Sequence, residues 1–163
     1  MRVVVPVCCA VWIATFVASL DGTIAAMLLG SISASFRASE QASWIGSSYL
    51  LSVCCVSPLY GRLGDIIGRR RSFVVALTLF TLGTFLCGRA TSMSEFLFAR
   101  TLTGLGGGGL STVGNVIMSH LVPLKNRGIL QGLTNIVFGL GAGTGAPFGG
   151  WLNDCLLYTS DAA

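Results

Sequence analysis

The chain has 163 residues, of which 53% are hydrophobic and 10% are charged, and its mean hydropathy is +0.79. A soluble domain carries about 25% charged residues, so this composition excludes an ordinary soluble globular protein. The net charge of +4 does not indicate a nucleic-acid-binding protein, because the basic residues lie between apolar runs and not along one face. We therefore expect an all-α membrane protein without a nucleic-acid partner.

Five apolar runs predict five transmembrane helices, over residues 3–30, 42–60, 72–88, 96–122 and 128–152. Each run reaches the lower limit of about 17 residues that a helix needs to cross a bilayer. The strands of a membrane barrel would alternate polar and apolar residues over about ten positions, whereas these runs are continuous. The first run follows Arg2 and could be a signal peptide. It is long, however, it carries Asp21, and further runs follow it.

The connectors between the runs predict an orientation. If the N-terminus lies in the cytosol, the inner segments hold seven basic residues and the outer segments hold two, Arg37 and Arg89. The inner seven are Arg2, Arg62, Arg69, Arg70, Arg71, Lys125 and Arg127. This asymmetry satisfies the positive-inside rule, so we expect a multi-pass protein with a cytosolic N-terminus.

The connector over residues 61–71 is the most distinctive segment of the chain. It reads Gly-Arg-Leu-Gly-Asp-Ile-Ile-Gly-Arg-Arg-Arg and holds five of the sixteen charged residues. We expect a short loop in which Gly61 and Gly68 permit a tight turn. Asp65 could cap the next helix or accept hydrogen bonds from Arg69. A simple topology anchor would explain the arginines but not the aspartate and the glycines.

This connector resembles the signature loop of the major facilitator superfamily. The matching residues are Gly61, Leu63, Asp65, Gly68, Arg69 and Arg70. In that family the loop latches the two halves of a transporter in the outward-open state, and the resemblance implies that role here. It also implies that the chain is an incomplete N-terminal half of a fold with 12 or 14 helices. The substrate site of such a fold lies near the membrane midplane, between the two halves.

Asp21 is the first of two charged residues inside the apolar runs, where insertion of a charge costs about 2.5–3.5 kcal/mol. Its surroundings, Leu-Asp-Gly-Thr-Ile, resemble the first-helix motif of drug and amino-acid antiporters in the superfamily. The match ends afterwards, with Ala26 where Asn is common and Gly30 where Pro is common. The resemblance implies a carboxylate that lines the cavity or the coupling path. The alternative is a hydrated Asp21 near the outer interface.

Arg100 is the second such residue, and it precedes Thr103 and Gly104. This spacing resembles the fourth-helix motif of the family, whose arginine is linked to proton coupling. A guanidinium cannot itself shuttle protons at ordinary pH, so it would hold a fixed positive charge beside a titrating carboxylate or the substrate. Asp21 is a candidate partner if the two helices bring it close. The alternative is an arginine that snorkels to the membrane surface.

Glycines crowd two of the runs. Gly104-x-Gly106-x-x-Gly109 matches the dinucleotide-binding fingerprint, but the strand and the βαβ unit that this fingerprint requires are missing from the sequence pattern. Small residues at such spacings let helices pack closely. We therefore expect helix-packing residues at Gly104, Gly106, Gly141, Gly145, Pro147, Gly149 and Gly150. The second group resembles the fifth-helix antiporter motif, with Pro147 one residue late, and looks like the version in fungal vacuolar amino-acid permeases.

Two further features concern the ends and the cysteines. Residues 155–163 look like an in-frame translation of a transposon-type sequencing adaptor. We expect a scar there and a partial transporter domain over residues 1–154.

The six cysteines form no Cys-x-x-Cys pair, and the chain has a single histidine. We expect no metal site and no cofactor.

The resemblance implies a proton-coupled antiporter of small molecules, with basic amino acids as the expected substrates and a vacuolar or plasma membrane as the location. A multidrug efflux pump of the same fold is one alternative, and a non-transporting helical bundle is another. We see no nucleophile–base pair and expect no enzyme activity. The expected partners are the substrate, protons, the lipid bilayer and the C-terminal helices of a full-length protein. Without those helices the segment should be inactive.

Overall fold

The computed structural model describes residues 4–30, 32, 42–121, 123 and 126–160, and it describes the backbone alone for residues 4, 5, 42 and 152–160. Within these residues the chain forms five helices and no strand, which confirms the expected fold class. They are α1 (Val4–Met27), α3 (Ala42–Ile66), α4 (Arg69–Arg89), α5 (Met93–Leu121) and α6 (Arg127–Ser160). A helix suits these apolar runs because it satisfies its backbone hydrogen bonds internally, as lipid requires.

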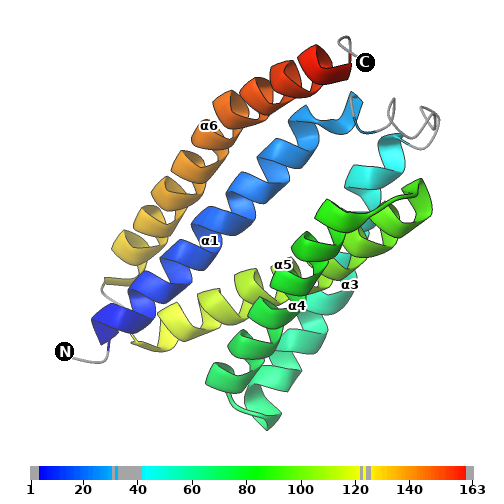
Figure 1. Cartoon of the computed structure of the whole chain (residues 1–163). Helices are drawn as coiled ribbons and strands as arrows, with labels where there is room; N and C mark the ends of the chain where they lie inside the picture. Colours follow the sequence, from blue (N-terminus) through cyan, green and yellow to red (C-terminus); the bar gives the residue numbers. More distant parts are fainter. Residues whose placement is uncertain (1–3, 31, 33–41, 122, 124–125, 161–163) are drawn as a thin grey trace.

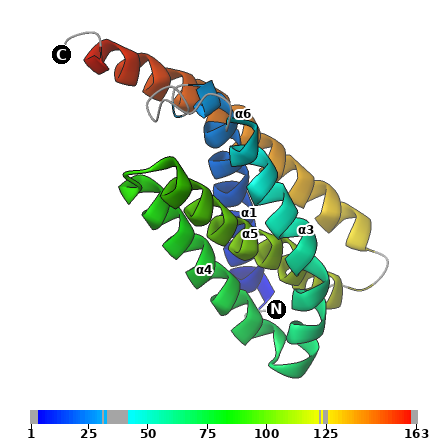
Figure 2. The same cartoon turned by 90° about the vertical axis from the view of Figure 1, so that its right-hand side faces the viewer.

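The helices form two groups (Figures 1 and 2). α1 and α6 lie side by side and run in the same direction, whereas α5 packs against both α3 and α4. We call these the α1–α6 pair and the α3–α4–α5 group. The two groups meet mainly where α1 touches α5, and this contact is much less extensive than that of α1 with α6 or those of α5 with α3 and α4.

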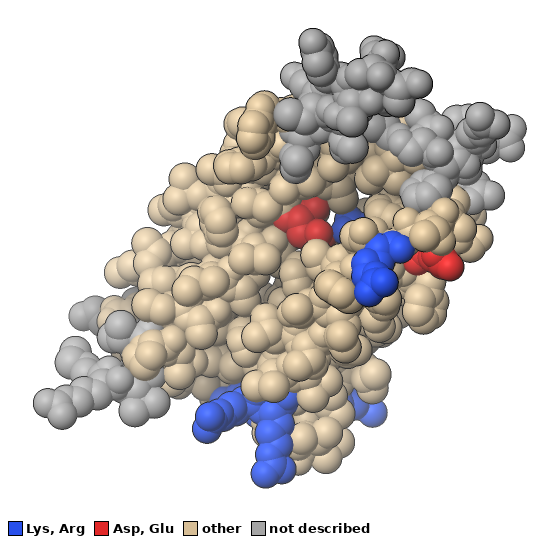
Figure 3. Space-filling view, viewed as in Figure 1, with Lys and Arg blue, Asp and Glu red and all other residues tan. Residues whose placement is uncertain are grey.

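Successive helices alternate in direction, so the start of α1, the α3–α4 turn, the end of α5 and the start of α6 lie at one end of the molecule (Figure 1). Figure 3 shows basic side chains at this end and a largely uncharged surface above them. Two helical segments, Pro6–Met27 and Arg69–Arg89, are long and apolar enough to cross a membrane by length and composition. The five spans and their orientation stay predictions.

The charged connector is mostly helical, so the prediction of a loop over residues 61–71 is wrong in its extent. α3 continues to Ile66 and α4 begins at Arg69, which leaves two residues between the helices. Gly68 makes the turn with a φ of +94°, a conformation that favours glycine. Gly61 lies inside α3, and its predicted role in the turn is wrong. Apolar character ends where the helix enters a polar environment, but backbone hydrogen bonding continues beyond that point.

α5 likewise begins before its predicted span, because its first turn is capped. Ser92 Oγ accepts a hydrogen bond from the Glu95 amide at 3.3 Å. Glu95 Oε2 in turn accepts bonds from the amide and the hydroxyl of Thr91, both at 2.9 Å. This reciprocal arrangement is close to a capping box, which satisfies the free amides at a helix start. At the other end of the chain, the helical backbone of α6 continues to Ser160, through part of the expected scar.

Glycines bring α5 close to both of its neighbours. A Cβ on Gly104 would lie 2.6 Å from the carbonyl oxygen of Tyr49 on α3, and one on Gly106 would overlap the backbone of Phe80 on α4. Such separations essentially never occur between real atoms. α5 can therefore approach α3 and α4 this closely because these positions carry no side chain.

The glycines of α6 make a similar face against α1. Cβ atoms on Gly141, Gly145 and Gly149 would lie 2.7 Å from Phe16 O, 2.8 Å from Thr23 Cβ and 3.0 Å from Met27 Cβ. Their spacing of four residues keeps them on one side of the helix. Two other predicted packing residues lie off this face: no described atom would come within 4 Å of a Cβ on Gly150, and Pro147 is exposed.

Candidate functional site

Arg100 and Asp21 meet inside the bundle, between α5 and α1. Arg100 Nη1 donates a hydrogen bond to Asp21 Oδ2 at 2.9 Å. The arginine side chain is 5% exposed and the aspartate side chain 19%. Arg100 therefore points into the bundle and does not reach for its end, as a snorkelling side chain would. Figure 3 shows acidic atoms next to basic atoms near the middle of this face, apart from the charged side chains toward its right-hand side and its lower end.

Tyr49 of α3 is the third member of this cluster. The ring centroid of Tyr49 lies 5.1 Å from Arg100 Cζ, within the range of a cation–π contact. Sequence reasoning did not single out Tyr49, because a tyrosine inside an apolar run is usual in a helical membrane protein. Which residues of α5 face Tyr49 depends on how the helices pack, and the sequence alone does not give this packing.

Hydrogen bonds to α6 hold α1 in place around Asp21. Ser19 Oγ donates to the carbonyl oxygen of Phe138 at 2.8 Å, and Trp12 Nε1 donates to Thr134 Oγ1 at 3.2 Å. On the opposite side, Thr103 of α5 is fully buried, and its hydroxyl donates to the carbonyl oxygen of Ala99 at 2.9 Å. The Thr103 bond lies within α5, so the ion pair joins α5 to a helix that α6 holds in place.

Arg100 keeps one buried nitrogen, Nε, without a hydrogen-bond partner in the described part of the chain. A guanidinium has five N–H donors, and a buried donor without an acceptor costs about 1–3 kcal/mol. The single contact to Asp21 thus leaves capacity for a further acceptor if the cluster rearranges.

The predicted latch residues lie far from this cluster along the helices, at the α3–α4 turn. No side-chain hydrogen bond caps α4 at Gly68, its N-cap residue, and in the described part of the chain Arg100–Asp21 is the one ion pair. The predicted helix cap by Asp65 and its bond to Arg69 are therefore wrong within the described residues. Arg69 Nη2 instead lies 2.9 Å from His120 Nε2, near the end of α5. Asp65 is exposed in the last turn of α3.

The remaining latch residues have ordinary surroundings. Leu63 packs against the core cluster that includes Tyr60 and Ala76. Arg70 is exposed at the start of α4. No described atom would come within 4 Å of a Cβ on Gly61. In this segment the described residues leave Asp65 and Arg70 exposed and available for contacts.

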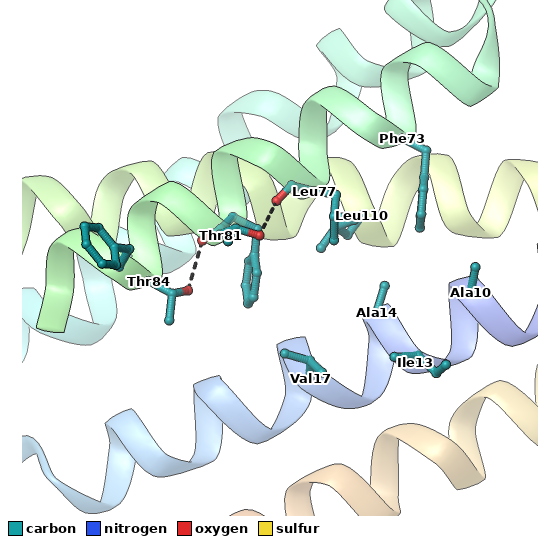
Figure 4. Close-up of a pocket in the computed structure, with 11 residues that line it drawn as sticks. Ala10, Ile13, Ala14, Val17, Phe73, Leu77, Thr81, Thr84 and Leu110 are labelled. Atoms are coloured by element: carbon teal, nitrogen blue, oxygen red, sulfur yellow. Dashed lines mark hydrogen bonds between the residues drawn. The ribbon is translucent and has the colours of Figure 1, made fainter.

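An apolar cavity of about 620 Å³ separates α1 from α4 (Figure 4). Side chains of α1, such as Ala14, point toward side chains of α4, such as Phe73. Two hydroxyls line it, and both bond to carbonyl oxygens of their own helix: Thr81 to Leu77 at 2.8 Å and Thr84 to Phe80 at 2.9 Å. Among the described residues that line it, none is charged. Because a charged ligand needs polar partners, we do not place a substrate site there.

The described residues contain no group of three or more side chains that could hold a metal ion.

Comparisons with known proteins identify the family of the chain. The sequence model of the Major Facilitator Superfamily matches residues 11–157. The chain is 48% identical over 141 residues to "Multidrug resistance protein fnx1" of Schizosaccharomyces pombe, a match that covers 86% of this chain and 27% of the relative. It is 39% identical over 137 residues to "Vacuolar membrane amino acid uptake transporter fnx2" of the same yeast, covering 84% and 24%.

A relative from a second yeast is also similar. The chain is 39% identical over 145 residues to "Vacuolar basic amino acid transporter 1" of Saccharomyces cerevisiae, covering 89% of this chain and 26% of the relative. The chain thus spans about a quarter of the length of these three relatives.

Proposed function

Because the chain belongs to the major facilitator superfamily, a family of membrane transporters and not of enzymes, we propose that it forms the N-terminal part of a proton-coupled antiporter. The proposed substrates are basic amino acids, since two relatives are named as vacuolar amino acid transporters. The observation that carries the proposal is the ion pair of 2.9 Å between Arg100 and Asp21.

The pair offers a way to couple proton binding to movement. Asp21 is partly exposed, whereas its arginine partner is almost fully buried. When Asp21 takes up a proton it becomes neutral and leaves the charge of Arg100 without compensation. Removing one partner of a buried pair costs about 3–5 kcal/mol, so a conformation that gives Arg100 another acceptor becomes favoured. The Nε–H of Arg100 is a donor that such an acceptor can use.

The grouping of the helices indicates which parts of the bundle would move in this change. α1 meets the α3–α4–α5 group through apolar residues around Ala14 and Leu110 and through the ion pair. The contacts of α6 with α1, and those of α5 with α3 and α4, are close-packed at glycines. Opening the ion pair would let the α1–α6 pair shift against the α3–α4–α5 group while these glycine contacts stay intact.

The other roles are proposed with the same transporter in mind. The segment over residues 61–71 would latch the two halves through Asp65 and Arg70, which are exposed. The N-terminus would face the cytosol, in a vacuolar or plasma membrane. Residues 1–154 alone would be inactive, because the proposed substrate site needs helices from both halves.

A multidrug efflux pump is the second candidate, favoured by the 48% identity to a protein named for multidrug resistance. A lipophilic cation needs a carboxylate, such as that of Asp21, but has no carboxylate of its own for Arg100. A basic amino acid carries both charges and can use both members of the pair.

Uptake into proteoliposomes would test the proposal and separate the two candidates. The complete transporter that carries this segment is reconstituted, and uptake of lysine, arginine, histidine and a cationic dye is measured with and without a pH gradient. We expect saturable amino-acid uptake that the gradient accelerates. If the gradient accelerates uptake of the dye and not of the amino acids, the efflux pump is favoured. If uptake of either substrate is the same with and without the gradient, proton coupling is contradicted.

A further inference from the structure

We propose that Tyr49 is a positioning residue, which aims the Arg100 guanidinium at Asp21 and thereby maintains the coupling of transport to the proton gradient. This inference rests on the proposed function for its coupling role. The placement of Tyr49 is an observation independent of that function: its ring centroid lies 5.1 Å from Arg100 Cζ, across the α3–α5 interface.

The guanidinium needs such a constraint because one hydrogen bond alone, the bond to Asp21, does not fix its orientation. Nη1 is bonded to Asp21, while Nε has no partner among the described residues. One bond lets the planar group rotate about its contact, so that another N–H could face the carboxylate. An aromatic ring over one face restricts this rotation, since it attracts the cation at a defined distance and blocks that side.

The titratable neighbours of the guanidinium come from three helices. Among the described residues they are Asp21 on α1, Tyr49 on α3 and Cys87 on α4. The Cys87 thiol lies near Thr103, with Sγ and Oγ1 3.9 Å apart. Asp21 is therefore the acidic group that the ring of Tyr49 holds the arginine against.

The end of the Tyr49 side chain lies against Gly107 of α5. A Cβ on Gly107 would lie 2.7 Å from Tyr49 Oη and 3.4 Å from Cζ, and the three nearest atoms it would meet all belong to the Tyr49 side chain. A methyl group at position 107 would thus displace the end of this one side chain. If the hydroxyl is absent, the nearest distance becomes 3.4 Å, which is an ordinary contact.

This geometry yields a matched pair of substitutions. Gly107→Ala should push the ring away from Arg100, and Tyr49→Phe should make room for the added methyl. Gly107→Ala alone should impair coupling, whereas the Gly107→Ala/Tyr49→Phe double variant should regain it. Gly108→Ala is the control at the same interface, because its Cβ would meet the backbone of Val53 at 3.1 Å and not Tyr49. Adding Tyr49→Phe should not rescue it.

Tyr60→Leu controls for the loss of a buried ring. Tyr60 lies on the same helix as Tyr49 and is 4% exposed, but it packs against Ala76 and Gly109, away from the ion pair. Comparing Tyr60→Leu with Tyr49→Leu separates general destabilisation of α3 from an effect on Arg100.

The first test uses the complete transporter in proteoliposomes and compares two rates over a series of pH values. One is substrate uptake driven by a pH gradient, and the other is substrate exchange without a gradient. We expect the ratio of these rates to fall about tenfold in Tyr49→Leu and Gly107→Ala, the scale of a partly desolvated cation–π contact. It should stay within about twofold of wild type in Tyr49→Phe, in the double variant and in Tyr60→Leu. An unchanged ratio in Gly107→Ala, or no rescue by Tyr49→Phe, would overturn the inference.

The second test does not depend on transport. Thermal unfolding of the same transporter in detergent is measured for Tyr49→Leu, Arg100→Met and the double variant. If the ring positions the guanidinium, the two substitutions act on one contact and their effects are not additive. Additive effects would contradict the inference. If the effects are not additive but the protein shows no gradient-driven uptake, Tyr49 still positions Arg100, and it is the proposed proton coupling that is refuted.

Discussion

Arg100 Nη1 lies 2.9 Å from Asp21 Oδ2, although 79 residues separate the two along the chain. Each charge alone would be costly inside an apolar bundle, and each supplies the compensation that the other needs. The pair also crosses the boundary between the α1–α6 pair and the α3–α4–α5 group. The predictions below follow from this contact and from the glycine faces and helix ends around it.

Removal of Arg100 should uncouple transport. Arg100→Ala in the complete transporter should abolish uptake driven by a pH gradient, and Arg100→Lys should be tolerated poorly. Lysine has no planar fork, and its ammonium can lose a proton when it is buried. Gradient-driven uptake in proteoliposomes, at equal protein level, is the measurement.

Asp21→Asn tests the other half of the pair. It should also stop gradient-driven uptake and should lower stability by about 3–5 kcal/mol, because the arginine charge stays buried. The double variant Asp21→Asn/Arg100→Gln carries no charge and should regain most of that stability without regaining coupling. Full gradient-driven uptake in either single variant would mean that the pair has a structural role only.

The cap at the start of α5 should respond to acid. Hydrogen bonds from the Thr91 amide and hydroxyl lower the pKa of Glu95 from its ordinary value of 4.5. The carboxylate therefore stabilises the helix start above that value, and the effect is lost as the pH falls through the lower pKa of the folded state. Exchange of the Thr91 amide with deuterium should accelerate in this acid range. Glu95→Gln should show little of this pH dependence, and equal protection of the wild-type amide at all pH values would contradict the prediction.

Much of the helical layout could be predicted from the sequence, because apolar runs and helices coincide over most of their length. The error at residues 61–71 arose because hydropathy reports where lipid-like character ends, whereas α3 continues its backbone hydrogen bonding to Ile66. The early start of α5 was readable from Ser92 and Glu95, whose spacing is that of a capping box.

The candidate site could be predicted in part. Asp21 and Arg100 stood out because charges are rare inside apolar runs, but their distance depends on helix packing, which spacing along the chain does not give. Tyr49 could not be recognised for the same reason: its ring reaches Arg100 because Gly107 has no side chain. The packing of the α6 glycines against α1 is likewise known only from the tertiary arrangement, because the spacing of these glycines along the chain does not show which helix faces them.

Asp65 should matter for transport and not for folding. It is exposed, and the described residues give it no ion pair, so Asp65→Asn should leave membrane insertion and thermal stability unchanged. If the exposed carboxylate latches the two halves, the same variant should reduce transport by the complete protein strongly. Normal uptake by Asp65→Asn would contradict the latch.

The α3–α4 turn should face the cytosol. A cysteine introduced there by Arg70→Cys should therefore resist an impermeant thiol reagent applied from outside intact cells. Efficient labelling would contradict the cytosolic placement.

The contact between α6 and α1 should depend on the absence of a side chain at Gly145. A Cβ there would lie 2.8 Å from Thr23 Cβ and 3.2 Å from the carbonyl oxygen of Leu20, so Gly145→Ala forces backbone apart and not merely the end of a flexible chain. Overpacking of this kind costs about 1–3 kcal/mol. Gly143→Ala is the matched control, two residues away on the same helix with no described atom within 4 Å of its Cβ. Thermal unfolding in detergent should show a lower midpoint for Gly145→Ala and none of that loss for Gly143→Ala. Equal midpoints for the two variants would mean that lipid or detergent, and not α1, faces the glycine side of α6.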